Sequence, residues 1–105
     1  MARTKFLFGN WKMNHLISET KKFASEVGAA VTLAKEKNIE IGVAPSFLSL
    51  QTMAEANTGL IIASQDVHFS PSGAFTGFVS IPMIKELGIN WTILGQDVFM
   101  PMKPH

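Results

Sequence analysis

The stretch IEIGVAPSFLSL (residues 39–50) decides the fold. It begins with an apolar run that stops at Pro45, and Ser46 then precedes a segment with apolar residues on one helical face, among them Phe47 and Leu50. Proline cannot donate a hydrogen bond to a sheet, and serine is a preferred residue just before a helix. The stretch therefore predicts a buried strand that passes directly into a helix, which is the repeating unit of parallel α/β proteins.

The same alternation extends in both directions along the chain. Strands are expected at residues 5–9, 39–44, 60–63 and 91–94, and helices at residues 18–34, 46–57 and 80–88. Ser18 is the expected cap of the first helix, and Pro82 suits the first turn of the last helix. Gly28 weakens the middle of the first helix and allows a kink or an early break there. This order predicts an α/β fold with a βαβαβαβ parallel sheet and right-handed crossovers. Functional side chains in such folds follow the carboxyl ends of the strands.

Length and composition indicate one structural unit with unusually little charge. The 105 residues correspond to a single domain over residues 1–105, or to an incomplete part of one. Apolar residues make up 47% and charged residues 16%, against a usual charged fraction of about 25%. Some apolar side chains are therefore expected on the surface or against a partner.

Several classes of function are disfavoured by what the chain contains. A net charge of +1 with scattered signs gives no basic stripe for nucleic acid. The absence of cysteine excludes disulfides, cysteine-ligated zinc and a thiol nucleophile. The three histidines show no ligand spacing, and His68 is expected to be a loop residue on the surface. We expect no metal, no cofactor and no membrane association, and a cytoplasmic location.

Five short motifs follow the expected strands and resemble one family. They are FGNWKMN (residues 8–14), VAPSF (residues 43–47), SQDV (residues 64–67), GAFTG (residues 73–77) and ILG (residues 93–95). In this order and spacing they resemble triosephosphate isomerase, and GNWKMN together with GAFTG is highly specific. The resemblance implies a (βα)8 barrel of about 250 residues. This chain is similar to its first through fourth strands, which implies a half-barrel, truncated relative to the family.

The resemblance also implies a site and an activity. The family interconverts dihydroxyacetone phosphate and glyceraldehyde 3-phosphate with a glutamate base and a neutral histidine electrophile. Asn10 and Lys12 match its active-site pair, so a triose phosphate, or a phosphate or sulfate ion, is the expected ligand near Lys12. Thr76 matches a threonine that supports the partner subunit's active site, and Gln65 matches a structural glutamine.

The chain departs from the family pattern where catalysis would depend on it. Gln96 stands at the position of the electrophilic histidine, and an amide cannot shuttle a proton. The family's base belongs to a later part of its barrel. Asp97 is a weak candidate for a replacement base, because an aspartate after a strand is usually a turn residue. We therefore expect Gln96 to be non-functional as an electrophile and the chain to lack isomerase activity on its own.

Apolar residues replace a charged pair of the family. Phe78 stands where the family has a glutamate, and residues 98–100, Val-Phe-Met, stand where it has charged residues that include the glutamate's arginine partner. Replacing both partners of an ion pair by packed apolar groups can be neutral or stabilising. The expected interface residues are Phe75, Thr76, Gly77, Phe78, Val98 and Phe99. The phenylalanines among them are expected to pack together rather than to stack on bases.

A half-barrel leaves one face of its sheet and two edge strands uncovered, which favours association. The simplest arrangement is a homodimer of two half-barrels related by a two-fold axis, or a higher homo-oligomer. An alternative is a flatter sheet with residues 98–102 folded over the open face. Two functions stay open: an inactive self-associating scaffold, and an isomerase or weak triose-phosphate binder that acts when assembled.

Overall fold

The computed structural model describes residues 5–94 and 98–101. The elements are β1 (Lys5–Asn10), α1 (Ile17–Glu26), α2 (Gly28–Glu36), β2 (Ile39–Ala44), α3 (Phe47–Ala56), β3 (Ile61–Ser64), α4 (Ile81–Glu86), β4 (Trp91–Leu94) and β5 (Val98–Pro101). Each of the four strands and the last two helices lies where the sequence predicts it, within one or two residues.

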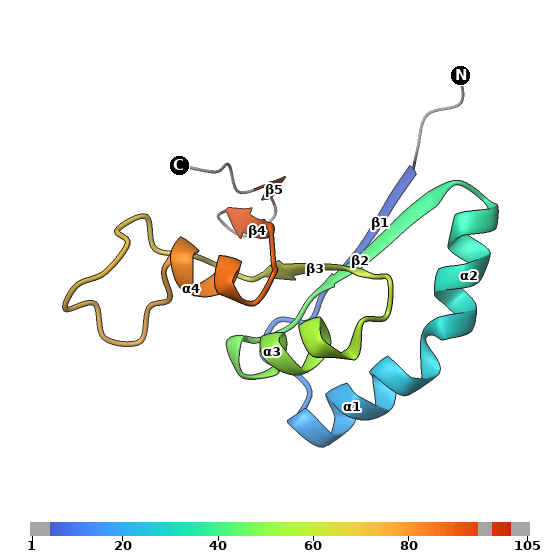
Figure 1. Cartoon of the computed structure of the whole chain (residues 1–105), viewed down its shortest axis with the longest axis horizontal. Helices are drawn as coiled ribbons and strands as arrows, with labels where there is room; N and C mark the ends of the chain where they lie inside the picture. Colours follow the sequence, from blue (N-terminus) through green and yellow to red (C-terminus); the bar gives the residue numbers. More distant parts are fainter. Residues whose placement is uncertain (1–4, 95–97, 102–105) are drawn as a thin grey trace.

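The sheet has the strand order β1-β2-β3-β4-β5, and its first four strands are parallel (Figure 1). The sheet curls so strongly that the ring of Phe6 in β1 lies 5.9 Å from that of Trp91 in β4. Four parallel strands that curl in this way and alternate with helices form half of a (βα)8 barrel. The predicted fold class is therefore confirmed.

Apolar side chains pack on both faces of the sheet. On the outer face, Leu50 of α3 and Ile84 of α4 pack with Ile89, and Ile62 of β3 joins this cluster. On the inner face the buried cluster consists of Ala44, Ala63 and Ile93, with Phe8 and Trp91 packed against it. Because successive side chains of a strand point to opposite faces, Ile62 faces the helices while Ala63 faces the interior of the curl.

Gly42 allows the inner face to close. A Cβ atom at this position would lie 2.5 Å from the carbonyl oxygen of Ile61 and 2.5 Å from Cζ of Phe8. The ring of Phe8 therefore lies across β2 at a point where only a glycine leaves room. This close approach helps the short strands to curl toward the interior of the half-barrel.

The segment after β1 differs from the sequence prediction at its start. The helical stretch expected over residues 18–34 is divided into α1 and α2 by a break at Val27, next to Gly28, where the sequence allowed an early break. The helix begins after Leu16 rather than at Ser18, so the predicted Ser18 cap is wrong. Oε1 of Glu19 accepts a hydrogen bond from the backbone N–H of Leu16 at 2.9 Å, which satisfies a donor that a serine cap would leave free.

The later helices begin and end within two residues of their predicted bounds. Ser46 precedes α3, although its side chain makes no capping hydrogen bond. Asn57 ends this helix in the left-handed conformation, with φ of 52°. Ser80 caps α4 by accepting a hydrogen bond from the backbone N–H of Met83, and Pro82 lies in its first turn.

Residues 98–101 form a strand that the sequence does not predict. β5 is antiparallel to β4, with Leu94 opposite Val98 and Trp91 opposite Pro101. The idea that this segment folds over the open face of a flatter sheet is wrong for these residues, because they extend the curled sheet at its edge. A proline is tolerated on an edge strand, because the backbone groups on its outer side have no neighbouring strand to bond.

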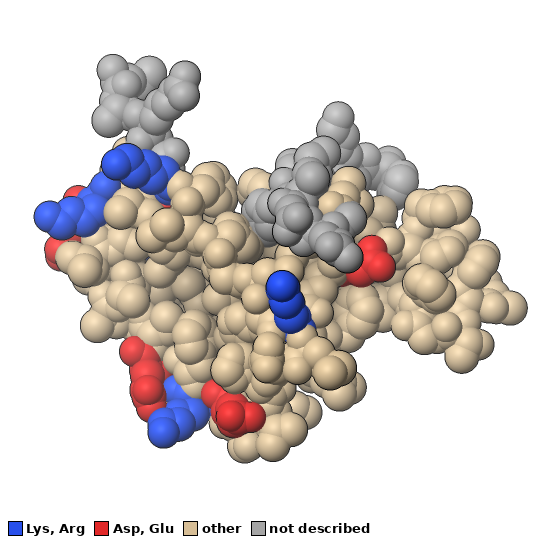
Figure 2. Space-filling view, turned by 180° about the vertical axis from the view of Figure 1, so that it is seen from behind, with Lys and Arg blue, Asp and Glu red and all other residues tan. Residues whose placement is uncertain are grey.

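The molecule is more open than an average domain of its length. Its radius of gyration is 14.1 Å, against about 13 Å expected for a compact chain of this size. The loop of residues 65–80 projects far from the sheet (Figure 1), and on the face drawn in Figure 2 its outer part carries no charged side chain. No helix in the described part of the chain is long and apolar enough to span a membrane.

Candidate functional site

The loop after β1 carries Asn10 and Lys12 at the carboxyl edge of the sheet. Asn10 is the last residue of β1, and its Oδ1 accepts a hydrogen bond from the backbone N–H of Lys12 at 3.0 Å. Lys12 has φ of 55°, in the left-handed region that costs a residue with a side chain about 1–2 kcal/mol. Both side chains are exposed. The turn thus uses the Asn10 amide to hold Lys12 in an unfavourable backbone conformation.

Gln65 ties this loop to the neighbouring strands. Its Nε2 donates to the carbonyl oxygen of Lys12 at 2.7 Å and to that of Ala44, the last residue of β2, at 3.0 Å. The carbonyl of Ala44 also accepts from the backbone N–H of Trp11 at 3.1 Å. Both peptide groups of Lys12 are therefore hydrogen-bonded to side chains, so its Cα position is fixed while its ammonium group stays in solvent. The sequence motif indicated a structural role for Gln65, and the hydrogen bonds describe that role.

An aromatic cluster supports the far side of the same loop. The ring of Trp11 lies 4.6 Å from the ring of His15 and 5.2 Å from that of Phe23 in α1, both edge-on. Nδ2 of Asn14 donates to the carbonyl oxygen of Trp11 at 2.8 Å. The loop is consequently anchored to α1 as well as to β2 and β3, which makes it a rigid platform for the Lys12 side chain.

The described side chains of the Asn10–Lys12 turn suit the binding of an anion. Among the described residues of the loops after β1, β2 and β3, the only groups with full charge are Lys12 and Asp66. Lys12 offers a compact positive charge, and Asn10 offers an amide beside it. Oδ1 of Asp66 accepts from the backbone N–H of Val67 at 2.9 Å, which is the local turn contact typical of an aspartate.

The projecting loop (residues 65–80) presents the residues expected at an interface. The backbone N–H of Phe78 donates to the carbonyl of Phe75, and Gly77 between them has φ of 84°, so the GAFTG motif ends in a tight turn that requires glycine. Phe75, Thr76, Gly77 and Phe78 are all exposed. These four residues lie together at the outer part of one loop, as an interface requires. Contact with a partner stays a prediction.

His68 lies inside the aromatic part of this loop, and sequence reasoning missed its role. Its ring lies 4.0 Å from the ring of Phe75, 5.3 Å from that of Phe78 and 4.9 Å from that of Phe69. The expectation of a surface residue is corrected, because the side chain is partly buried among these rings. No local sequence signal marks such contacts, since they depend on how the loop folds back on itself.

The other candidate residues lie near β5. Gln96 and Asp97 lie outside the described residues. The backbones of Val98 and Phe99 are in β5, opposite Leu94 and Ile93 of β4. The side chains of residues 98–101 are outside the described part, so the predicted apolar contact between them and Phe78 stays a prediction.

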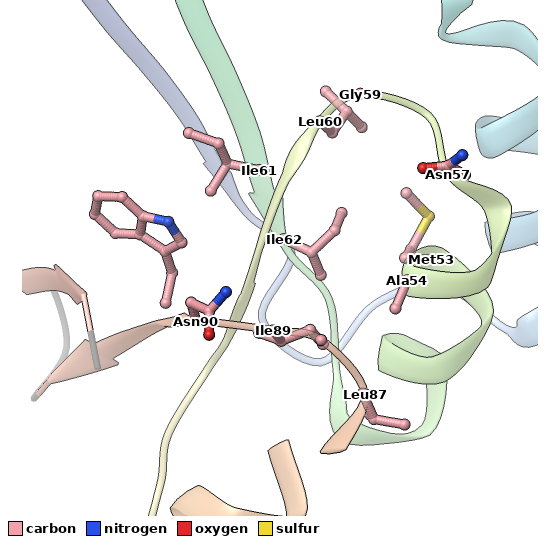
Figure 3. Close-up of a pocket in the computed structure, with 12 residues that line it drawn as sticks. Met53, Ala54, Asn57, Gly59, Leu60, Ile61, Ile62, Leu87, Ile89 and Asn90 are labelled. Carbon is pink, nitrogen blue, oxygen red and sulfur yellow. The ribbon is translucent and has the colours of Figure 1, made fainter. Parts of the chain in front are cut away.

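A cavity of about 280 Å³ lies at the opposite end of the sheet (Figure 3). It is bounded by Met53 of α3 and Asn57 just after that helix, by Ile62 of β3, and by Leu87 and Ile89 before β4. These elements meet at the amino ends of the strands, whereas functional side chains of parallel α/β folds gather at the carboxyl ends. No charged residue lines the cavity. It is therefore a packing feature, and Asn10 and Lys12 remain the candidate site.

Comparison with known proteins agrees with the motifs and the curled sheet. A sequence model described as triosephosphate isomerase matches residues 5–96. The chain belongs to the triosephosphate isomerase family. It is 43% identical over 97 residues to the triosephosphate isomerase of Clostridium acetobutylicum, an alignment that covers 90% of this chain and 38% of that protein.

Further relatives in the triosephosphate isomerase family cover the same share of the chain. The triosephosphate isomerase of Chlamydia felis is 38% identical over 101 residues, with 92% of this chain and 39% of that protein covered. That of Mycoplasma mobile is 39% identical over 99 residues, with 90% and 41% covered. The chain thus spans about two-fifths of the length of these curated relatives.

Proposed function

We propose that this chain is a self-associating half-barrel of the triosephosphate isomerase family that binds a phosphate group but does not turn over triose phosphates on its own. The observation that carries the proposal is the pairing of a preserved Asn10–Lys12 turn with an exposed apolar loop. The turn supplies part of an anion-binding site, and the loop exposes apolar side chains to solvent. The remaining groups of an isomerase site are not contributed by the described residues of this chain.

Self-association is supported by the apolar surface of the projecting loop. Phe69 is 87% exposed, Phe78 57% and Phe75 46%, and each contacts the ring of His68. Met83 of α4, which lines a small cavity together with His68, Phe75 and Phe78, is also exposed. Contiguous apolar surface of this kind usually marks a site of protein association. We propose a second copy of this chain as the partner, because the curled sheet has open edges that another half-barrel would complete.

Phosphate binding is supported by the rigidity of the turn. Asn10 and Gln65 hold the backbone of Lys12 through hydrogen bonds of 3.0 and 2.7 Å, so little backbone order would be lost on binding. A single exposed lysine binds an anion weakly. The expected ligand is therefore the phosphate of a small sugar phosphate, or inorganic phosphate or sulfate, with millimolar affinity.

The lack of turnover follows from the groups that isomerisation needs. Proton abstraction beside a carbonyl requires a positioned base, and the carboxylate of Asp66 is engaged with the backbone N–H of Val67. Gln96, where the family pattern has a histidine, could donate a hydrogen bond but could not relay a proton. Losing one such electrostatic donor typically lowers the rate by about 10²–10³, and losing the base lowers it further.

Light scattering after size exclusion tests the association. The expected result is a particle of at least twice the 11.5 kDa mass of one chain. Phe78→Glu places a charge in the apolar loop and should produce monomers. Leu33→Glu is the matched control, because Leu33 is 55% exposed on α2, far along the chain from the loop. A monomeric wild-type chain, or equal dissociation by both variants, would overturn the proposal.

A second candidate function is weak isomerase activity in the assembled state, favoured by the well-held Lys12 turn. A coupled isomerase assay at high protein concentration decides between the two. Turnover that rises with assembly and disappears in Lys12→Ala would establish the second function. Phosphate binding without turnover, again lost in Lys12→Ala, is the result that the primary proposal expects.

A further inference from the structure

His68 lies at the base of the projecting loop, where the start of the loop pairs with its end. Its backbone N–H donates to the carbonyl of Val79 at 2.7 Å, and it forms an isolated parallel bridge with Ser80. Its ring then stacks on Phe75 at 4.0 Å, with the planes inclined by 30°, and meets the edge of Phe78. The imidazole is therefore the contact that joins the base of the loop to its exposed aromatic residues.

One hydrogen bond defines the protonation state that this arrangement requires. Nδ1 of His68 accepts from the backbone N–H of Ser70 at 3.1 Å. A ring nitrogen can accept only when it carries no proton, so this contact requires a neutral ring with its proton on Nε2. Protonation would convert Nδ1 into a second donor facing the N–H of Ser70. The hydrogen bond would then be lost, and two donors would oppose each other.

Among the described residues, no side chain with a full negative charge lines the space beside the ring. The cavity beside it, of about 40 Å³, is lined by serines, Gly73, Phe75, Phe78 and Met83, with no charged residue among them. The charged residues of the flanking segments are Asp66, Lys85 and Glu86, and none of them lines this cavity. Stacking on Phe75 favours an imidazolium only weakly, and the ring of Phe75 supplies no acceptor for a proton on Nδ1.

We propose that His68 is a proton-controlled latch of the projecting loop. The neutral imidazole holds residues 68–70 and the rings of Phe75 and Phe78 in one arrangement, and protonation releases that arrangement. The latched loop predominates on the alkaline side and is lost as the pH falls. The consequence for assembly rests on the proposed self-association, because the same rings form the associating surface.

The test uses the whole chain and two single variants. His68→Gln keeps a side-chain acceptor for the N–H of Ser70 at every pH, whereas His15→Gln removes another histidine that contacts an aromatic ring, Trp11. Nitrogen NMR of the imidazole and hydrogen exchange of the Ser70 amide are measured from pH 8 to 5.5. Sedimentation velocity over the same range gives the association constant.

The expected result has three parts. At pH 8 Nδ1 of His68 is unprotonated and the Ser70 amide is protected. On acidification to pH 5.5 that protection falls about tenfold, the amount that corresponds to losing one well-formed hydrogen bond. Association weakens by a similar factor in the wild type and His15→Gln, and not in His68→Gln. A proton on Nδ1 at pH 8, or an unchanged pH dependence in His68→Gln, would overturn the latch.

Failure of the latch and failure of self-association give different readings. A chain that is monomeric at every pH contradicts the proposed function, and the latch is then judged on the Ser70 amide alone. A chain that associates equally at pH 8 and 5.5, with constant Ser70 protection, contradicts the latch and leaves self-association intact.

Discussion

The ring of Phe6 in β1 lies 5.9 Å from the ring of Trp91 in β4, with the two planes inclined by 54°. Two strands separate β1 from β4 in the sheet, so a contact between these rings requires a strong curl. The ring of Phe8 stacks on Phe6 at 6.1 Å and extends the contact along β1. These aromatic side chains fill the interior of the curled sheet. In a complete barrel, the remaining strands would help to enclose that interior.

Truncating Phe6 should therefore destabilise the chain more than its exposure of 46% suggests. We expect Phe6→Ala to lower the free energy of unfolding by about 1–2 kcal/mol, since full burial of a phenylalanine is worth about 3–5 kcal/mol and an aromatic pair adds about 0.5–1.5 kcal/mol. Denaturant unfolding followed by tryptophan fluorescence measures the change. Leu7→Ala, on the opposite face of the same strand, is the control and should cost less than about 1 kcal/mol. Equal costs would mean that the Phe6–Trp91 contact does not form in solution.

Gly42 should be the least replaceable glycine of the sheet. The Cβ of Gly42→Ala would meet the backbone oxygen of Ile61, which cannot move without displacing β3, as well as the ring of Phe8. Overpacking of this kind typically costs about 1–3 kcal/mol, and we expect the upper end. Gly28→Ala is the control, because nothing lies within 4 Å of its Cβ position and alanine favours the helix by up to about 1 kcal/mol. Thermal unfolding of the two variants should shift in opposite directions.

The sequence predicts the order of strands and helices because local signals coincide at each boundary. Ser46 and Pro45 separate a strand from a helix, and Asn57 ends that helix, with no contribution from distant residues. The curl was predicted through the family motifs rather than through periodicity. The Asn10–Lys12 turn was found in the same way, because a short motif fixes both its position and its residue types.

The features that were missed depend on contacts between distant residues. β5 contains Pro101 and only four residues, so its strand character comes from pairing with β4 rather than from its own sequence. The contacts of His68 with Phe75 and Phe78 exist only when the loop folds back on itself. The predicted start of α1 at Ser18 was wrong. The helix begins after Leu16, and the carboxylate of Glu19 accepts a hydrogen bond from the backbone N–H of Leu16.

Gln65 should be essential for the shape of the anion-binding turn. Gln65→Ala removes the donors to the carbonyl groups of Lys12 and Ala44, and we expect a loss of about 1 kcal/mol in stability, because solvent partly replaces these bonds. Gln65→Glu should cost more, since an ionised carboxylate would face two carbonyl oxygens. Binding of inorganic phosphate, followed through the NMR shift of the Lys12 amide, should weaken several-fold in both variants. Unchanged binding in Gln65→Glu would show that the turn is held by other contacts.

The left-handed backbone of Lys12 allows its charge and its conformation to be tested separately. Lys12→Ala and Lys12→Gly both remove the ammonium group, so both should abolish phosphate binding. Because φ is 55°, glycine adopts this conformation without a steric penalty, and Lys12→Gly should be more stable than Lys12→Ala by about 1 kcal/mol.

Lys12→Arg completes the series, since it keeps the charge and the backbone cost and should retain binding. Denaturant unfolding gives the stabilities, and a phosphate titration gives the affinities. If alanine and glycine were equally stable, the turn would not be left-handed in solution. If Lys12→Gly still bound phosphate, the anion would be held by groups other than the ammonium. We expect Lys12→Ala and Lys12→Gly to differ in stability but to lose phosphate binding equally. That result would separate the effect of backbone strain from the effect of the charge.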